Sequence, residues 1–234
     1  GKAPLTDELG EGPNPDIQPN HPYPEAGFSL PVQGFRGITD PNAFVTGFFP
    51  DIQDSVVLGV DEAGRGACMG PVIYGVAWVA SHKIGAFDHP LLRDSKQMTR
   101  NARAKVRSNL MADKSFGWAT HSVSAKAIDE ALLQPYQPHT MNWLGEAATI
   151  RLIDIIMHKY RVKHVYIDAL GDCETYKHKL LAVFPNLAYE MITIETKADD
   201  TFKIVSAASV FAKVARDTVQ AQARSRVNQG AWEM

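Results

Sequence analysis

Cysteine is nearly absent from this sequence, which has only Cys68 and Cys173 among its 234 residues. Two thiols without the close spacing of a metal-binding motif are typical of a reducing compartment rather than of a disulfide scaffold. Long apolar runs are also missing, because no stretch approaches the roughly 18 consecutive apolar residues of a membrane span. We therefore expect a soluble, intracellular protein with neither a disulfide framework nor a membrane partner.

A large excess of positive charge is missing as well, since the formal net charge is -2. The balance differs along the chain: residues 1–50 carry 2 basic and 6 acidic residues, whereas the remainder carries 22 basic and 20 acidic ones. The body of the chain is thus mildly basic. The net charge alone therefore does not point to a nucleic-acid partner, and a nucleic-acid function has to be argued from local motifs.

Proline is scarce outside the first 50 residues, which hold nine of the 14 prolines together with many Gly, Asn, Asp and Glu residues. A segment of this composition buries too little apolar area to offset the entropy of ordering it. We expect residues 1–50 to form a largely irregular extension. Residues 51–234 are expected to form one folded domain, because their length can enclose a sizeable core.

Alternation and β-rich composition in this domain predict five strands, at residues 56–61, 72–80, 115–123, 162–168 and 188–196. Helical periodicity predicts helices at residues 124–134, 141–160 and 175–184, and a long last helix that ends near residue 227. Ser124 is the expected N-cap of the first of these helices. Three strands followed by alternating helices and strands indicate an α/β fold with a mixed five-stranded sheet flanked by helices.

Acidic residues stand where two of the expected strands end. Asp61 and Glu62 close the first strand, and Asp168 closes the fourth. If these strands lie side by side and parallel, their carboxylates converge at one edge of the sheet, where Asp199 of the loop before the last helix can join them. A single Asp at such a position is more often a turn or cap residue, but three positions in register favour a shared site.

A cluster of carboxylates without histidine or thiolate ligands suits Mg²⁺ or Mn²⁺ rather than zinc. Two such ions are typical of phosphoryl chemistry, in which one activates a water molecule and the other stabilises the leaving oxygen. Gly64 and Gly66 follow the acids and allow a substrate backbone to approach the main chain between them. Arg65 suits a phosphate contact. A tight hairpin turn with a solvated arginine explains the same residues, so both interpretations stay open here.

The motifs "GVDEAGRG" and "GPV", then "DSK" at 94–96, "YID" at 166–168, "KAD" at 197–199 and "VSAASVFAKVARD" at 205–217, resemble those of type 2 ribonuclease H. They follow the order of that family and span residues 57–217. The motif "VSAAS" at 205–209 is most similar to that of the archaeal and eukaryotic branch of the family, which includes the catalytic A subunit of eukaryotic ribonuclease H2. The resemblance implies a ribonuclease-H-like fold.

It also implies Mg²⁺- or Mn²⁺-dependent cleavage of RNA in RNA–DNA hybrids, and incision on the 5′ side of single ribonucleotides in duplex DNA. By motif, the metal-binding acids are Asp61, Glu62, Asp168 and Asp199. The Gly64–Gly66 backbone and Arg65 then face the ribose 2′-OH, the group by which a protein distinguishes RNA from DNA. Further substrate contacts are expected from Lys96, Asn142, Ser206, Ser209 and Lys213. Arg216 and Asp217 are expected to form a structural pair on the last helix.

The sequence departs from the family pattern in three places. Ala67 and Cys68 follow "GRG" where the family usually has proline, and Asp200 after "KAD" competes with Asp199 for the fourth metal position, although the register favours Asp199. The family also has a tyrosine beyond "AKVARD" that stacks on the junction sugar, whereas no tyrosine follows Tyr189 here. The expectation is therefore a truncated chain or impaired substrate discrimination.

Two other functions are compatible with some of these features. A catalytically impaired nucleic-acid-binding module with the same fold stays open because of the missing tyrosine. Hydrolysis of a small phosphate ester is disfavoured by the "GRG" turn and by the lack of a deep-pocket signature. The resemblance further implies two accessory subunits and a nuclear location, for which no interface motif or basic targeting run is visible.

Overall fold

Six strands form one mixed sheet in the computed structural model, which describes residues 45–66, 71–87, 92, 98–133, 140–169 and 171–228. They are β1 (Val45–Phe48), β2 (Val56–Ala63), β3 (Val72–Ala80), β4 (Gly117–Val123), β5 (Val162–Asp168) and β6 (Ile192–Glu195). Their order across the sheet is β1-β4-β3-β2-β5-β6. The expected mixed α/β sheet is confirmed, but the expected number of five strands is wrong. The four-residue β1 was missed because it lies in the proline-rich stretch and pairs only with the distant β4.

Strand pairing brings three strand ends to the same edge of the sheet. β2 and β3 are antiparallel neighbours, as their short connection predicts. β2 pairs in parallel with β5, and β5 pairs in parallel with β6. Because parallel strands run in one direction, the C-terminal ends of β2, β5 and β6 lie together, and these are the ends that carry or precede the predicted acids.

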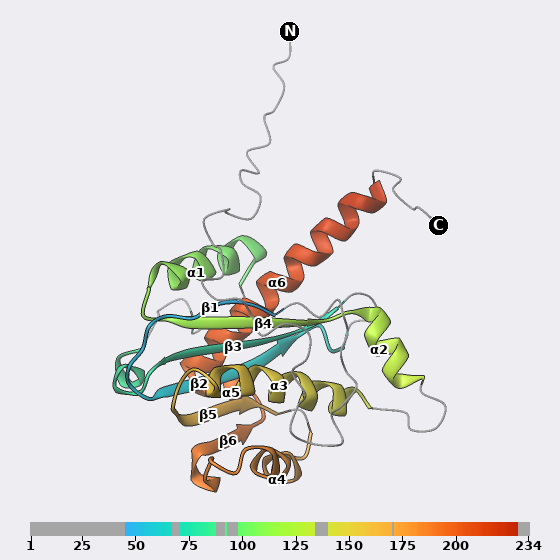
Figure 1. Ribbon diagram of the computed structural model, residues 1–234. Coiled ribbons are helices and arrows are strands. Elements are labelled where there is room, and N and C mark those ends of the chain that lie inside the picture. The colour runs from blue at the N-terminus through green and yellow to red at the C-terminus, as the bar shows by residue number, and fades with distance from the viewer. Residues whose placement is uncertain are drawn as a thin grey trace.

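Helices cover both faces of the sheet (Figure 1). One face carries α3 (Met141–Met157) and α4 (Cys173–Val183), with α2 (Ala125–Leu132) beside α3; the other carries α6 (Lys203–Asn228) and α1 (Arg100–Ala112). The four-residue α5 (Ala198–Thr201) joins β6 to α6, and the short 3-10 turns are η1 (Ser81–Ala86) and η3 (Tyr189–Met191). Ser124 caps α2 by accepting a hydrogen bond from Ala127, as expected. No helix in the described ranges is long and apolar enough to cross a membrane.

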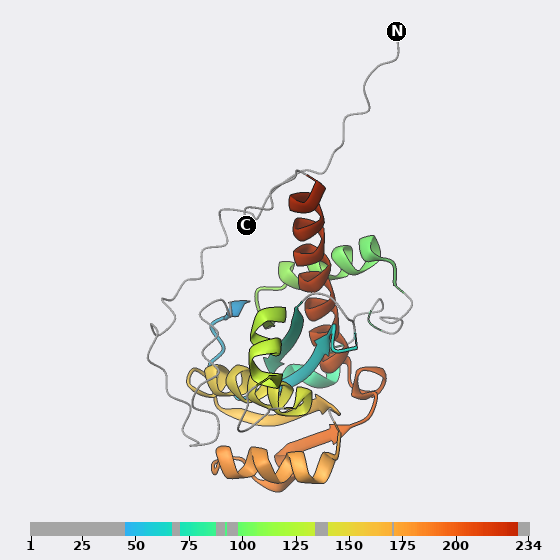
Figure 2. The ribbon, with the colours of Figure 1, turned by 90° about the vertical axis from the view of Figure 1, so that its right-hand side faces the viewer.

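α6 lies unusually close to the sheet because two glycines stand beneath it. A Cβ atom on Gly59 would lie 2.4 Å from the backbone carbon of Ile204, and one on Gly75 would lie 2.5 Å from the carbonyl oxygen of Ala208. Both helix residues are fully buried in the core between α6 and the sheet. This approach fixes α6 across the middle of β2 and β3, while the C-terminal part of α6 extends beyond the sheet (Figures 1 and 2).

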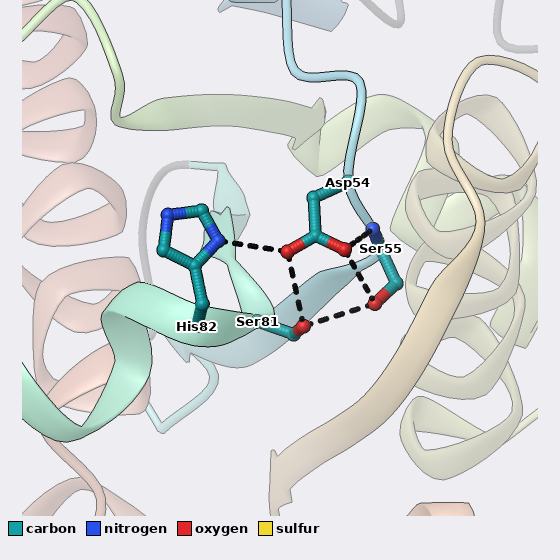
Figure 3. Close-up of polar contacts among 4 residues, drawn as sticks. All are labelled: Asp54, Ser55, Ser81 and His82. Carbon is teal, nitrogen blue, oxygen red and sulfur yellow. Dashed lines mark hydrogen bonds and ion pairs between the residues drawn. The ribbon is translucent and has the colours of Figure 1, made fainter.

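Polar side chains connect β2 to β3 at the end of β2 that is opposite to Asp61 (Figure 3). Asp54 Oδ2 lies 2.7 Å from His82 Nδ1, and the Ser55 hydroxyl donates to the Ser81 hydroxyl over 2.9 Å. The Ser81 backbone N–H also donates to the Ser55 carbonyl. These contacts hold the register of the β2–β3 pair, and this register determines where Asp61 and Glu62 stand at the other end.

Candidate active site

Asp61 and Asp168 are neighbours at the C-terminal edge of the parallel pair β2–β5. Val60 pairs with Ile167, so the next residue of each strand is an acid. Val60 and Ile167 both pack in the core beneath α3 and α4. Because side chains alternate along a strand, Asp61 and Asp168 point to the α6 face, whereas Glu62 points to the α3 face. The edge of the sheet is thus approached by carboxylates from both sides.

The acids at this edge are buried and lie close enough for their charges to raise one another's pKa values. Burial raises the pKa of Asp61 to about 7, and the charge of Asp168 raises it further against the opposing effects of the Ser209 hydroxyl and Lys213. Burial likewise raises the pKa of Glu62 to about 8, assisted by Asp61 and Asp168 and opposed by Arg65. Each carboxylate therefore disfavours ionisation of the next, which is the condition that a bound cation relieves.

Two buried tyrosines behind Glu62 were missed by sequence reasoning. Tyr74 pairs with Glu62 across β2–β3, and burial together with the Glu62 charge raises the pKa of its phenol. Tyr176 of α4 lies nearby, and burial raises its pKa too. Within the described part of the chain neither hydroxyl makes a hydrogen bond of regular geometry. The hairpin register, which places Tyr74 opposite Glu62, was the available signal for the first of them.

Asp199 is connected to Asp168 through its own neighbour in the chain. The Ala198 backbone N–H donates a 2.8 Å hydrogen bond to Asp168 Oδ1. The Asp199 side chain is buried at 6% exposure, whereas Asp200 is exposed. Position thus favours Asp199 over Asp200 as the acid that accompanies Asp168.

The turn after Glu62 has a backbone that requires glycine. Gly64 has φ of 102°, and a Cβ atom there would lie 2.3 Å from Nε of Arg216, so the arginine packs directly against the turn. Gly66 is exposed with open space around it. Arg65 is half-buried and donates a hydrogen bond to Asn142 Oδ1 at the start of α3. This bond places Asn142 at the same edge and shows that Arg65 is not simply a solvated turn residue.

The other expected substrate contacts have different surroundings. Ser206 and Ser209 are fully buried on the inner face of α6, and the Ser206 hydroxyl donates a 2.8 Å hydrogen bond to the Leu92 carbonyl. In this conformation the Ser206 hydroxyl is taken up by the Leu92 carbonyl and does not face outward. Lys213 is half-buried near Asp61. Lys96 lies outside the described residues.

The expected pair of Arg216 and Asp217 does not form. Asp217 instead accepts from Arg103 over 2.7 Å and from Arg100 over 3.2 Å, both of which belong to α1. Adjacent residues on a helix point in different directions, which explains why Arg216 turns to Gly64 while Asp217 turns to α1. Arg103 also donates to the Met98 carbonyl, so this contact connects α6 to the chain just before α1.

The ribonuclease HII family model matches residues 58–233. The chain belongs to the ribonuclease HII family. It is 34% identical over 168 residues to the A subunit of ribonuclease H2 from Mus musculus, covering 71% of this chain and 54% of that protein. For the corresponding protein of Schizosaccharomyces pombe the identity is 34% over 180 residues, covering 75% and 54%. The chain therefore spans about half the length of these relatives.

Solved structures agree with the fold. The ribonuclease H2 from Pyrococcus horikoshii matches with a TM-score of 0.58 and 30% identity, over 76% of this chain and 79% of that one. A ribonuclease HIII structure, Bst-RNase HIII in complex with Mn²⁺, matches with a TM-score of 0.60 over 75% of this chain and 56% of that one. At 20% identity this second likeness concerns the fold alone. The expected resemblance to type 2 ribonuclease H and its ribonuclease-H-like fold is confirmed.

Proposed function

We propose that the chain carries the catalytic domain of an endoribonuclease. The substrates are RNA within RNA–DNA hybrids and single ribonucleotides embedded in duplex DNA, cut on their 5′ side. One observation carries the proposal: Asp61, Glu62 and Asp168 meet at one sheet edge, directly beside the Gly64–Gly66 turn. Phosphodiester hydrolysis needs carboxylates next to a surface that accepts a sugar–phosphate backbone, and this edge offers both. Membership of the ribonuclease HII family supports the same class of reaction.

Asp61, Glu62, Asp168 and Asp199 would hold Mg²⁺ or Mn²⁺, because carboxylate oxygens are the ligands that these ions prefer. The donor set fits, since a cation would offset the burial and the mutual repulsion that together raise the pKa values of Asp61 and Glu62. Among the described residues, no three Asp, Glu, His or Cys side chains are already gathered as ligands of one ion. When bound, two ions supply an activated water molecule and a stabilised leaving oxygen.

The remaining residues of the edge would bind and orient the nucleic acid. The backbone at Gly64 and Gly66 meets the ribose, whose 2′-OH distinguishes RNA from DNA. Arg65 faces the adjoining phosphate, and its hydrogen bond with Asn142 limits the motion of its side chain. Lys213 adds positive charge from the α6 side, where each phosphate contact makes binding more sensitive to salt.

Assembly and location belong to the same proposal. The eukaryotic relatives carry the name of the A subunit of ribonuclease H2, which supports a catalytic chain that works with accessory subunits. Cleavage of ribonucleotides in duplex DNA suits a nuclear role in replication and ribonucleotide excision repair.

The test is a nicking assay on a DNA duplex that holds one ribonucleotide, with Mg²⁺ or Mn²⁺. We expect the wild-type chain to nick on the 5′ side of the ribonucleotide, and D168N to bind the duplex without cutting it. E190Q, which alters an exposed acid outside the site, serves as the control and should cut as wild type does. A wild-type chain that binds but does not cut with either ion would instead support the nucleic-acid-binding module.

A further inference from the structure

Lys197 has a backbone conformation that is rare for its residue type. It is the one residue other than glycine with positive φ among the described residues, at φ 61° and ψ 38°. An L-residue in this left-handed region is disfavoured by contact of its Cβ with the backbone. Such conformations persist only where the surrounding structure enforces them, and they concentrate at functional sites. Lys197 stands between β6 and α5, two positions before Asp199.

Hydrogen bonds hold the chain just after this residue. The Lys197 carbonyl accepts from Asp200 over 3.0 Å, and the Ala198 carbonyl accepts from Phe202 over 2.8 Å. The Ala198 side chain is fully buried in the core beneath α6. The turn at Lys197 is therefore fixed by α5, and it cannot relax to an extended conformation while these contacts last.

The turn links two of the proposed metal ligands. Its left-handed residue directs the Ala198 N–H to Asp168 Oδ1, at 2.8 Å, and the next residue in the chain is Asp199. The Ala169 N–H donates to the Glu195 carbonyl over 2.9 Å, which keeps β5 and β6 paired just beyond Asp168. A change of backbone conformation at Lys197 would move Ala198 away from Asp168 and shift Asp199 at the same time.

The side chain of Lys197 takes no part in these contacts. It is exposed, and no described residue hydrogen-bonds or ion-pairs with its ammonium group. The turn thus requires of position 197 the conformation of the backbone rather than the amine.

We propose that Lys197 is a positioning residue whose left-handed backbone sets Asp168 and Asp199 relative to each other and thereby sets the affinity for divalent ions. The inference rests on the proposed metal site. It makes a prediction that separates branching at Cβ from loss of charge. Glycine and asparagine adopt the left-handed region readily, alanine does so about as well as lysine, and β-branched residues are rare outliers there.

The experiment compares K197G, K197A and K197V by calorimetric titration of the folded protein with Mn²⁺ alone, without nucleic acid. All three changes remove the amine. We expect K197G and K197A to bind Mn²⁺ within about twofold of wild type, and K197V to bind on the order of tenfold more weakly. K163V is the matched control, because Lys163 is an exposed residue of β5 whose extended backbone suits valine. It should leave the Kd unchanged.

Circular dichroism at the titration temperature checks that each variant is folded, and K197T replaces K197V if the latter does not fold. A Kd for K197V equal to that of wild type overturns the inference, because the turn then serves stability alone. Equal weakening by all three variants overturns it in favour of the amine. A wild-type chain that does not bind Mn²⁺ removes the proposed metal site and this inference with it, whereas the first two outcomes leave the proposed function intact.

Discussion

Asp61 and Asp168 lie side by side in neighbouring parallel strands, and each is the acid that follows a paired core residue. Asp61 is only 6% exposed. The negative charge of Asp168 raises the pKa of Asp61, and the charges of Asp61 and Asp168 raise the pKa of Glu62. Without a cation this arrangement works against the fold, because a buried carboxylate is disfavoured and its neighbours disfavour it further. The site thus carries a cost in stability that a divalent ion is expected to remove.

The first prediction concerns this cost. D61N should stabilise the ion-free protein by roughly 1–3 kcal/mol at pH 8, because it removes a buried charge from among its neighbours. The pKa of Asp61 is about 7 in the fold against an ordinary value of 3.8, so the folded state binds the extra proton. Ion-free wild type should therefore lose stability as pH rises from about 4 to about 7. Urea unfolding of both proteins at pH 5 and pH 8 measures this difference.

Addition of Mg²⁺ provides the control for that measurement. The ion should raise the thermal midpoint of wild type at pH 8 and should have little effect on D61N, which lacks one ligand. An ion-free D61N protein that is less stable than wild type at pH 8 would contradict the argument, since it would mean that Asp61 is stabilised by contacts other than a cation.

Arg65 and Asn142 form the second testable relationship. N142A removes the hydrogen-bond acceptor that restricts the motion of the Arg65 side chain. We therefore expect cleavage at a single ribonucleotide to fall by roughly three- to tenfold, with a smaller effect on stability. R65A should reduce cleavage further, because it also removes the proposed phosphate contact. Single-turnover rates on the ribonucleotide duplex measure both. If the double variant loses as much as the product of the two single effects, the residues act independently and their contact has no role in catalysis.

Local sequence patterns predicted the position of the acids because hydrophobic alternation marks where a strand ends. The antiparallel β2–β3 hairpin followed from the same pattern, whereas the parallel pairing of β2 and β5 was only a condition of the predicted site and is seen in the structure alone. α1 was not foreseen, because only Val106 and Leu110 of its 13 residues are buried and its apolar periodicity is weak. Tertiary partners were also out of reach: nothing local indicates that Asp217 contacts α1.

The left-handed turn shows a further limit of the sequence. Glycine or asparagine is the usual signal for positive φ, and position 197 carries a lysine instead. The conformation there is imposed by buried Ala198 and by Asp168, two contacts that exist only after the sheet has formed. Residues whose conformation is set by such contacts look ordinary in the sequence.

Ser206 gives the third prediction, which distinguishes a structural from a substrate-binding role. S206A should destabilise the protein by about 1–3 kcal/mol, because the buried Leu92 carbonyl loses its donor. The affinity for an RNA–DNA hybrid at a temperature where the variant is folded should not change. Unfolding and hybrid binding are measured on the same preparation. Weakened hybrid binding at unchanged stability would instead identify Ser206 as a substrate contact, as the family motif implies.

The fourth prediction concerns the close approach of α6 to the sheet. G59A should destabilise the fold by about 2 kcal/mol or more, because its methyl group would overlap the backbone of α6 at Ile204. G85A is the matched control, since Gly85 has open space around its Cβ position. Chemical unfolding should show a large loss for the first variant and little change for the second. Equal losses would mean that glycine entropy, not the helix contact, decides the effect.

The fifth prediction concerns Asp54, at the far end of β2. The hydrogen bond from His82 is the main reason why the pKa of Asp54 is lowered to about 2, with a further contribution from the Ser55 backbone N–H. A depressed pKa in the fold means that the contribution to stability is present above the ordinary value of 3.8 and is lost as pH falls from about 4 to about 2. D54N should therefore be less stable than wild type at pH 6, and the difference should shrink as the pH is lowered through this range.

His82 allows a control for the same contact. H82A should reproduce most of the effect of D54N. The double variant should lose little more stability than either single variant, because both changes weaken the same hydrogen bond between Asp54 and His82. Since the pair is solvent-exposed, salt at about 0.5 M should weaken its electrostatic part without abolishing the hydrogen bond. A D54N effect that is independent of pH between about 2 and 6 would show that the carboxylate charge has no part in joining β2 to β3. Asp54 would then contribute through its hydrogen bonds with His82 and Ser55 and not through its charge.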